Sequence, residues 1–193
     1  MTDVYVLKLD MDRIRDEWDA LTDQVSHEKR ARLLGIRAFD DAARVLAADL
    51  LLRLLICRRT GLRGDDIRFG AARYGKPYLL GDEGRAVRFN VSHSGVWVAA
   101  SIGGCENGID IQEKRVVRGQ ADLDAFFEEW VLREARLKCT GAGILGRPDE
   151  HLFCRSYSPE AGVKAAACAV EDGFSDLHFM SMCEVLVANK KRP

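Results

Sequence analysis

The sequence lacks the features that mark several common classes of protein. Its net charge is only −1, from 29 basic and 30 acidic residues, so no positive excess indicates nucleic-acid binding. Its six cysteines show no paired spacing of the kind that holds a metal. No cationic stretch precedes an apolar run at the N-terminus, so no secretory signal is predicted. We therefore expect reduced thiols in a cytoplasmic protein, with no nucleic acid and no membrane among its partners.

The most apolar segment, residues 42–60, predicts a long helix but not a membrane span, because Arg44, Asp49 and Arg53 interrupt it. On a helical wheel Asp49 and Arg53 fall near one another, and Arg44 falls on roughly the opposite side among apolar neighbours. An arginine there needs a partner, because burying an unpaired charge is costly. Arg44 either extends out to water at the N-terminal end of the helix or contacts a phosphate.

The 193 residues, 47% apolar and 31% charged, have the composition of a soluble globular protein. Local signals place N-caps at Ser26, at Asp40 or Asp41 and at Asp122 or Asp124, and helix ends at Gly61 and Gly141. The predicted helices are 11–21, one beginning at Ser26, 42–60 and 124–140; the predicted strands are 4–9, 66–70, 89–95, 97–102, 108–112, 151–154, 163–170 and 184–187. Residues 189–193 are expected to fray.

The two halves of the chain share a layout of helix, hairpin and small-residue strand, although their sequences differ. This repetition favours a pseudo-twofold duplication of two similar α+β halves. We place the boundary after residue 103, which gives domains 1–103 and 104–193.

Polar side chains follow apolar ones in two neighbouring strands. The first carries Ser92 and His93, and the second alternates Ile109 and Ile111 with Asp110 and Gln112. A serine–histidine nucleophile pair is disfavoured, because adjacent side chains on a strand point to opposite faces and no G-x-S-x-G turn is present. Ser92 and His93 instead offer donors to phosphate oxygens.

The second long helix carries Glu134 and Lys138 one turn apart. Carboxylates of Asp110 and Glu134 on two rigid elements suit Mg²⁺, and Gln112 could add a carbonyl oxygen. Beside a metal and a diphosphate, Glu134 could deprotonate an attacking hydroxyl and Lys138 could neutralise the leaving phosphate. The alternative is that Asp110, Gln112 and Glu134 belong to ordinary polar faces. In that case Glu134 and Lys138 form a routine ion pair on an exposed helix.

Six short segments, in this order, carry a resemblance to a known family: residues 28–30, 41–44, 74–77, 89–95, 108–111 and 130–138. Together they resemble the 4'-phosphopantetheinyl transferases of the surfactin-synthetase-activating type. The resemblance implies two similar α+β halves with the site between them. It also implies an Mg²⁺-dependent enzyme that moves the phosphopantetheine arm of coenzyme A onto a serine of an apo acyl or peptidyl carrier protein. Adenosine 3',5'-bisphosphate is released.

The resemblance also implies the roles that we expect of particular residues. Asp110 and Glu134 would bind Mg²⁺, with Gln112 at a third ligand position, and Glu134 would also act as the base. Lys138, with Ser92 and His93, would face the diphosphate. The remaining coenzyme A contacts would be Lys29, Arg32, Arg44 and His93 at the 3'-phosphate, and Gly75, Lys76 and Pro77 at the adenine.

Two departures from the family pattern matter. Bacterial members usually carry a glutamate where this chain has Gln112, so Mg²⁺ should bind more weakly. The link from Gln112 to the helix of Glu134 is also short, which leaves open whether the carrier belongs to fatty acid, polyketide or peptide synthesis. A coenzyme A-binding sensor or partner protein without catalysis is therefore the alternative function, and a subunit that works only as an oligomer is a third.

Overall fold

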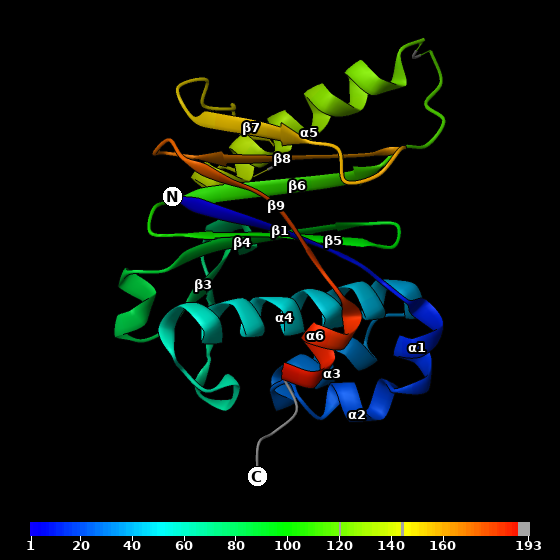
Figure 1. Ribbon diagram of the computed structural model, residues 1–193, viewed down its shortest axis with the longest axis vertical. Helices are drawn as coiled ribbons and strands as arrows, with labels where there is room; N and C mark the ends of the chain where they lie inside the picture. The colour runs from blue at the N-terminus through cyan, green and yellow to red at the C-terminus, as the bar shows by residue number, and fades with distance from the viewer. Residues whose placement is uncertain (120, 144, 189–193) are drawn as a thin grey trace.

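The computed structural model describes residues 1–119, 121–143 and 145–188, so the expected frayed tail at 189–193 lies outside it. Figure 1 shows four layers, with α5 above two sheets and α4 with the remaining helices below them. The first sheet has the order β4-β5-β1-β9, from Arg88–Ser94, Trp97–Gly103, Thr2–Lys8 and Phe174–Met180. The second has the order β6-β8-β7, from Asn107–Glu113, Val163–Ala169 and Phe153–Tyr157. A small third sheet pairs β2 (Phe69–Ala71) with β3 (Pro77–Leu79).

The helices begin and end largely where local chemistry predicts. Ser26 accepts a hydrogen bond from the backbone N–H of Lys29, and Asp122 accepts one from Ala125. Gly61 and Gly141 adopt the left-handed conformation that ends the two long helices. The helices are α1 (Met11–Asp16), α2 (Trp18–Thr22), α3 (His27–Leu34), α4 (Phe39–Thr60), α5 (Leu123–Thr140) and α6 (Met182–Ala188), with short 3-10 turns at Gly64–Asp66, Arg73–Gly75 and Asp82–Arg85.

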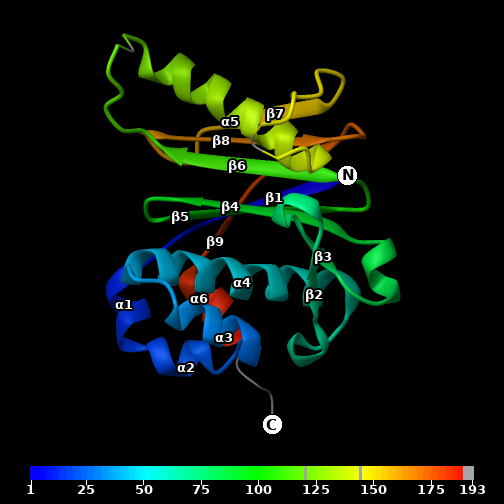
Figure 2. The same cartoon turned by 180° about the vertical axis from the view of Figure 1, so that it is seen from behind.

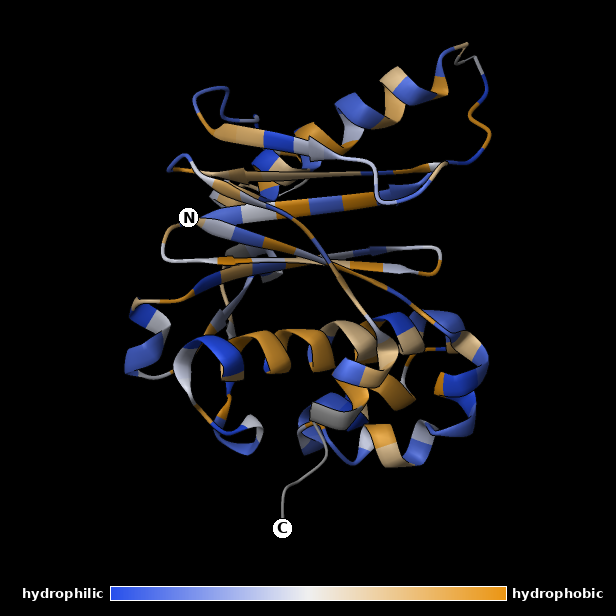
Figure 3. Cartoon of the chain, in the orientation of Figure 1, coloured by the Kyte–Doolittle hydropathy of each residue, from blue (hydrophilic) through white to orange (hydrophobic). Residues whose placement is uncertain are grey.

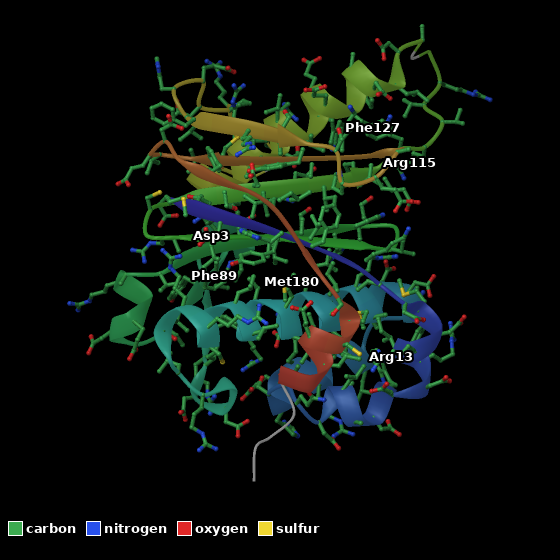
Figure 4. The ribbon with its side chains drawn as sticks, viewed as in Figure 1. Asp3, Arg13, Phe89, Arg115, Phe127 and Met180 are labelled. Carbon is green, nitrogen blue, oxygen red and sulfur yellow. A yellow bond between two sulfur atoms is a disulfide. The ribbon has the colours of Figure 1, made fainter. Side chains whose placement is uncertain are left out.

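Three apolar cores hold the layers together, and β5 contributes to two of them. Its Val98 and Ala100 face α4, whereas Trp97 and Ala99 face the second sheet, because successive side chains on a strand alternate. Phe89 and Met180 lie in the core between the first sheet and α4 (Figure 4). The third core lies under α5. The hydrophobic colouring along α4 and the strands in Figure 3 follows this layering.

Three expectations about local structure are wrong. Residues 184–187 lie in α6, where Met182, Val185 and Leu186 have helical spacing and are buried, and the last strand is β9. The helix of residues 42–60 begins earlier, at Phe39, so Asp40 and Asp41 lie in its first turn and are not its caps. The helix expected over residues 11–21 is broken at Glu17 into α1 and α2.

The expectation of reduced thiols is also wrong for two cysteines. Cys154 and Cys168 form a disulfide between directly opposite positions of β7 and β8. Cys57, Cys105, Cys139 and Cys183 are free. The pairing depends on the register of two strands, which the spacing of cysteines in the sequence does not reveal.

The mixed α and β content is as expected, whereas the pseudo-twofold duplication stays a prediction. Each sheet is covered by one long helix, α4 or α5, but the first has four strands and the second three. Strand β9, from the C-terminal part of the chain, pairs in parallel with β1 in the first sheet. The boundary after residue 103 likewise stays a prediction. Among the described residues, no helix has the length and apolar character needed to cross a membrane.

Candidate functional site

The site is built where β4 of the first sheet runs beside β6 of the second. Alternate side chains of β4 point to the same face of the strand. These side chains, and not a ladder of backbone hydrogen bonds, connect β4 to β6. Hydrogen bonds run from Ile109 N–H to Asn90 Oδ1 at 3.2 Å, from Ser92 Oγ to Asp110 Oδ1 at 2.7 Å and from Ser94 Oγ to Gln112 Oε1 at 3.1 Å. The junction between the sheets is therefore polar at its edge, although apolar side chains fill the space between their faces.

Lys138 of α5 completes a compact charged cluster with Asp110 and Ser92. Its Nζ donates to Asp110 Oδ1 at 2.6 Å and to Ser92 Oγ at 2.9 Å. Asp110 is only 2% exposed, so this ammonium and the Ser92 hydroxyl offset the cost of burying its charge. Three elements, β4, β6 and α5, thus bring together residues that are far apart in the sequence.

A cleft of about 280 Å³ lies next to this cluster. Glu134 and Lys138 line it from α5, one turn apart as the sequence predicts. The opposite wall is the turn before β3, where Tyr74 and Gly75 both have positive φ. Figure 2 shows β2 and β3 standing beside α4 and reaching the level of the first sheet. The full lining is Tyr74, Gly75, Lys76, Pro77, Asn90, Val91, Glu134, Leu137, Lys138, Gly141 and Gly143.

A second group of positive charge surrounds His93. Arg44 donates through Nη1 to the backbone oxygen of Gly95 at 2.9 Å and pairs with Asp41. Desolvation of the His93 ring, followed by the positive charges of Arg44 and Lys138, lowers the pKa of His93 below its ordinary value. His93 is therefore less readily protonated than an ordinary histidine, and an anion bound beside it would raise its pKa.

The other two predicted phosphate ligands lie on α3. Lys29 pairs with the buried Asp49 at 3.1 Å, and Asp49 also pairs with Arg53 at 2.7 Å as the helical wheel predicts. Asp49 follows Arg44 by five residues, so the two side chains lie about 140° apart around α4. The structure therefore holds Lys29 on a different side of α4 from Arg44. Arg32 is exposed.

The expected metal ligands are two carboxylates and one amide. Asp110 Oδ1 is occupied by Lys138 and Ser92, while Oδ2 has a 3.4 Å approach from Gln112 Nε2. Glu134 has an Arg133 guanidinium 3.5 Å away. Two carboxylates on a strand and a helix fit Mg²⁺, which commonly takes one or two carboxylates with water and phosphate. Gln112 fits less well, because its carbonyl oxygen accepts from Ser94 and its nitrogen is turned toward Asp110.

No group of three or more His, Cys, Asp or Glu side chains suited to a metal occurs within residues 1–119, 121–143 and 145–188. The expected pair of carboxylates, Asp110 and Glu134, has only two members and so does not count as such a group.

Sequence reasoning missed several residues that form the site. Asn90 and Ser94 connect β4 to β6, and their alternation with Ser92 is a signal that was present in the sequence. Leu137, Gly141 and Gly143 line the cleft because they surround the C-terminal end of α5. Their role depends on how α5 packs, so no local pattern indicates it.

The geometry defines a cleft walled by α5, by β4 and by the turn before β3, with the Asp110–Lys138 ion pair beside it. Comparison with known proteins agrees with the sequence resemblance. A family described as "4'-phosphopantetheinyl transferase, N-terminal" matches residues 12–103. The 4'-phosphopantetheinyl transferase psf-1 of Bacillus pumilus is 30% identical over 220 aligned residues, covering 93% of this chain and 94% of that protein.

Two further relatives are similar along nearly their whole length. The 4'-phosphopantetheinyl transferase ffp of Bacillus subtilis is 29% identical, covering 95% of this chain and 99% of the relative. The 4'-phosphopantetheinyl transferase Sfp of Bacillus subtilis strain 168 is 28% identical with the same coverage. The chain belongs to the 4'-phosphopantetheinyl transferase family, which confirms the resemblance.

The alignments also indicate a difference in length. They extend over 224 residues for ffp and 226 for Sfp, more than the 193 residues of this chain. These relatives therefore carry insertions that this chain lacks.

Proposed function

We propose that this protein transfers the 4'-phosphopantetheine arm of coenzyme A to a serine of an apo acyl or peptidyl carrier protein. The observation that carries the proposal is the cluster of Asp110, Ser92 and Lys138, in which Lys138 lines the cleft one helical turn from Glu134. Lys138 as an acid, Glu134 as a base and the Ser92 hydroxyl as a donor would suit a diphosphate bound beside them, which supports the proposal. The sequence relatives supply the class of reaction.

Coenzyme A lies in the cleft with its adenine against the turn of Gly75, Lys76 and Pro77. Its diphosphate meets Ser92, His93 and Lys138 at the other end. Arg44 and His93 are the best placed of the four residues for the 3'-phosphate, because they lie on the same side of α4. Lys29 joins them only if it leaves Asp49. Arg32, which is exposed, is free to turn toward the ligand as the family pattern implies.

Glu134 accepts the proton of the carrier serine as its oxygen attacks the pantetheine-side phosphorus. The bond from that phosphorus to the bridging oxygen breaks, and adenosine 3',5'-bisphosphate leaves. Lys138 neutralises the charge that develops on the leaving phosphate. Asp110 and Glu134 would hold Mg²⁺, which supplies further charge neutralisation at the diphosphate when bound. Gln112 contributes no negative charge to this metal site.

The test mixes the protein, Mg²⁺, coenzyme A and a panel of apo carrier proteins and measures each carrier by mass spectrometry. We expect one carrier in the panel to gain the mass of one phosphopantetheine arm. Glu134→Gln should abolish this gain and retain coenzyme A binding, whereas turnover in that variant would show that Glu134 is not the base. Tight coenzyme A binding with no transfer to any carrier would instead favour a sensor or partner protein.

A further inference from the structure

The ammonium group of Lys76 has no N–H left for a ligand. Its Nζ lies 2.7 Å from Glu106 Oε2, 3.1 Å from the backbone oxygen of Asn107 and 2.7 Å from the backbone oxygen of Cys139. An ammonium has three donors, and three acceptors surround this one. The side chain is only 15% exposed, although the residue lines the cleft.

These three contacts join the turn before β3 to the end of α5 and to the start of β6. Cys139 belongs to the last turn of α5, whose free carbonyl groups attract cations. Asn107 is the first residue of β6. Glu106 is held by Lys76 and also by Arg88, whose Nε lies 2.7 Å from Oε1. Burial alone would raise the pKa of Glu106, but its hydrogen bonds with Lys76 and Arg88 lower it, so Glu106 stays charged.

The two elements joined by Lys76 differ in how firmly they are held. Helix α5 packs on β6 and β8 through Val131, Ala135 and Cys139, all essentially buried. The turn belongs to a sheet of only two strands, each three residues long, and such a pair is marginal by itself. Loss of the ammonium should therefore loosen the turn and leave α5 in place.

We propose that Lys76 is a positioning residue, whose ammonium fastens the Tyr74–Gly75 turn to the end of α5 and so sets the distance between these two walls of the cleft. The inference rests on the proposed function, since it assumes that coenzyme A spans this cleft. Lys76 then borders the adenine through its backbone and stem, and its charge acts on the protein and not on the ligand.

The test compares Lys76→Met with the wild-type protein, using calorimetry to measure the binding of three ligands. These are coenzyme A, dephospho-coenzyme A without the 3'-phosphate, and adenosine 3',5'-bisphosphate without the pantetheine-side phosphate. We expect all three affinities to fall by the same factor, about tenfold, because the lost bonds lie within the protein. A direct phosphate contact would instead give a smaller loss for the ligand that lacks that phosphate, and this would overturn the proposal.

Hydrogen exchange provides a second readout that does not depend on any ligand. The backbone N–H groups of Ala72 and Gly75 are bonded within the turn, so their exchange reports its opening. Lys76→Met should speed exchange across residues 72–79 at least about tenfold and leave α5 unchanged. Unchanged exchange in the turn would contradict the proposal, even if the protein failed to bind coenzyme A and the proposed function were wrong.

Two further variants separate positioning from general destabilisation. Lys76→Arg keeps the positive charge and should restore most of the affinity. Arg88→Met removes the other cation on Glu106 without touching the turn, so binding and exchange should stay within about twofold of wild type. An Arg88→Met variant that behaved like Lys76→Met would show that the charge balance at Glu106, and not the fastening of the turn, causes the effect.

Discussion

Gly108 lies where the backbone of α5 approaches β6 closely, and we expect Gly108→Ala to displace the helix. A Cβ there would lie 2.2 Å from the backbone oxygen of Ala135 and 2.3 Å from the backbone nitrogen of Cys139. Backbone atoms of a helix cannot move aside by changing rotamer, so ordinary contact requires α5 to shift by about 1 Å. Such overpacking costs about 2 kcal/mol, which for a chain of this size lowers Tm by roughly 4–8 °C.

The same shift should affect transfer, because Ala135 and Cys139 are next in sequence to Glu134 and Lys138. A displacement of about 1 Å in catalytic groups can cost about 100-fold in rate. We therefore expect kcat for carrier modification to fall by about this factor. Gly104→Ala is the matched control, because the nearest atom to its new Cβ, the oxygen of Ala86, lies 4.0 Å away. If Gly108→Ala retained the wild-type Tm and rate, the close approach of α5 would not govern the site.

Three further predictions concern charge. Gln112→Glu should lower the half-saturating Mg²⁺ concentration about tenfold, because ligand charge tunes affinity; an unchanged value would remove this residue from the metal site. Because bound phosphate should raise the depressed pKa of His93, coenzyme A affinity should increase as pH falls from about 8 to about 6, and less so in His93→Gln. Identical slopes by calorimetry would contradict this. Asp49→Asn leaves the 4%-exposed Arg53 without a counter-ion and should lower the free energy of unfolding by about 3 kcal/mol, whereas Asp49→Leu with Arg53→Met should lose less. A larger loss in the double variant, by denaturant titration, would contradict this.

Local rules in the sequence predicted what depends on neighbouring residues. Ser26 caps α3 and Gly61 ends α4 because each acts on backbone groups within one turn. The ion pair of Asp49 and Arg53 follows from helical spacing alone. The alternation of Asp110 with Ile109 and Ile111 on a strand is confirmed, whereas its role with Glu134 as a metal ligand stays a prediction.

Long-range packing decided the features that the sequence did not reveal. The start of α4 at Phe39 accompanies the packing of that ring on Trp18, with centroids 5.1 Å apart. Strand β9 pairs with β1 from the other end of the chain, so its irregular pattern carries little local signal. The hydrogen bonds of the Lys76 ammonium also could not be predicted from the sequence, because its partners lie 30 residues or more away along the chain.

The central claim is that this chain transfers the phosphopantetheine arm, and the most direct measurement counts both products of one reaction. Apo carrier, coenzyme A and Mg²⁺ are incubated with the protein, and holo carrier and adenosine 3',5'-bisphosphate are quantified together. We expect the two products to form in equal amounts and neither to form with Glu134→Gln. Coenzyme A that stays intact with every carrier in the panel, while the protein binds it, would contradict the claim.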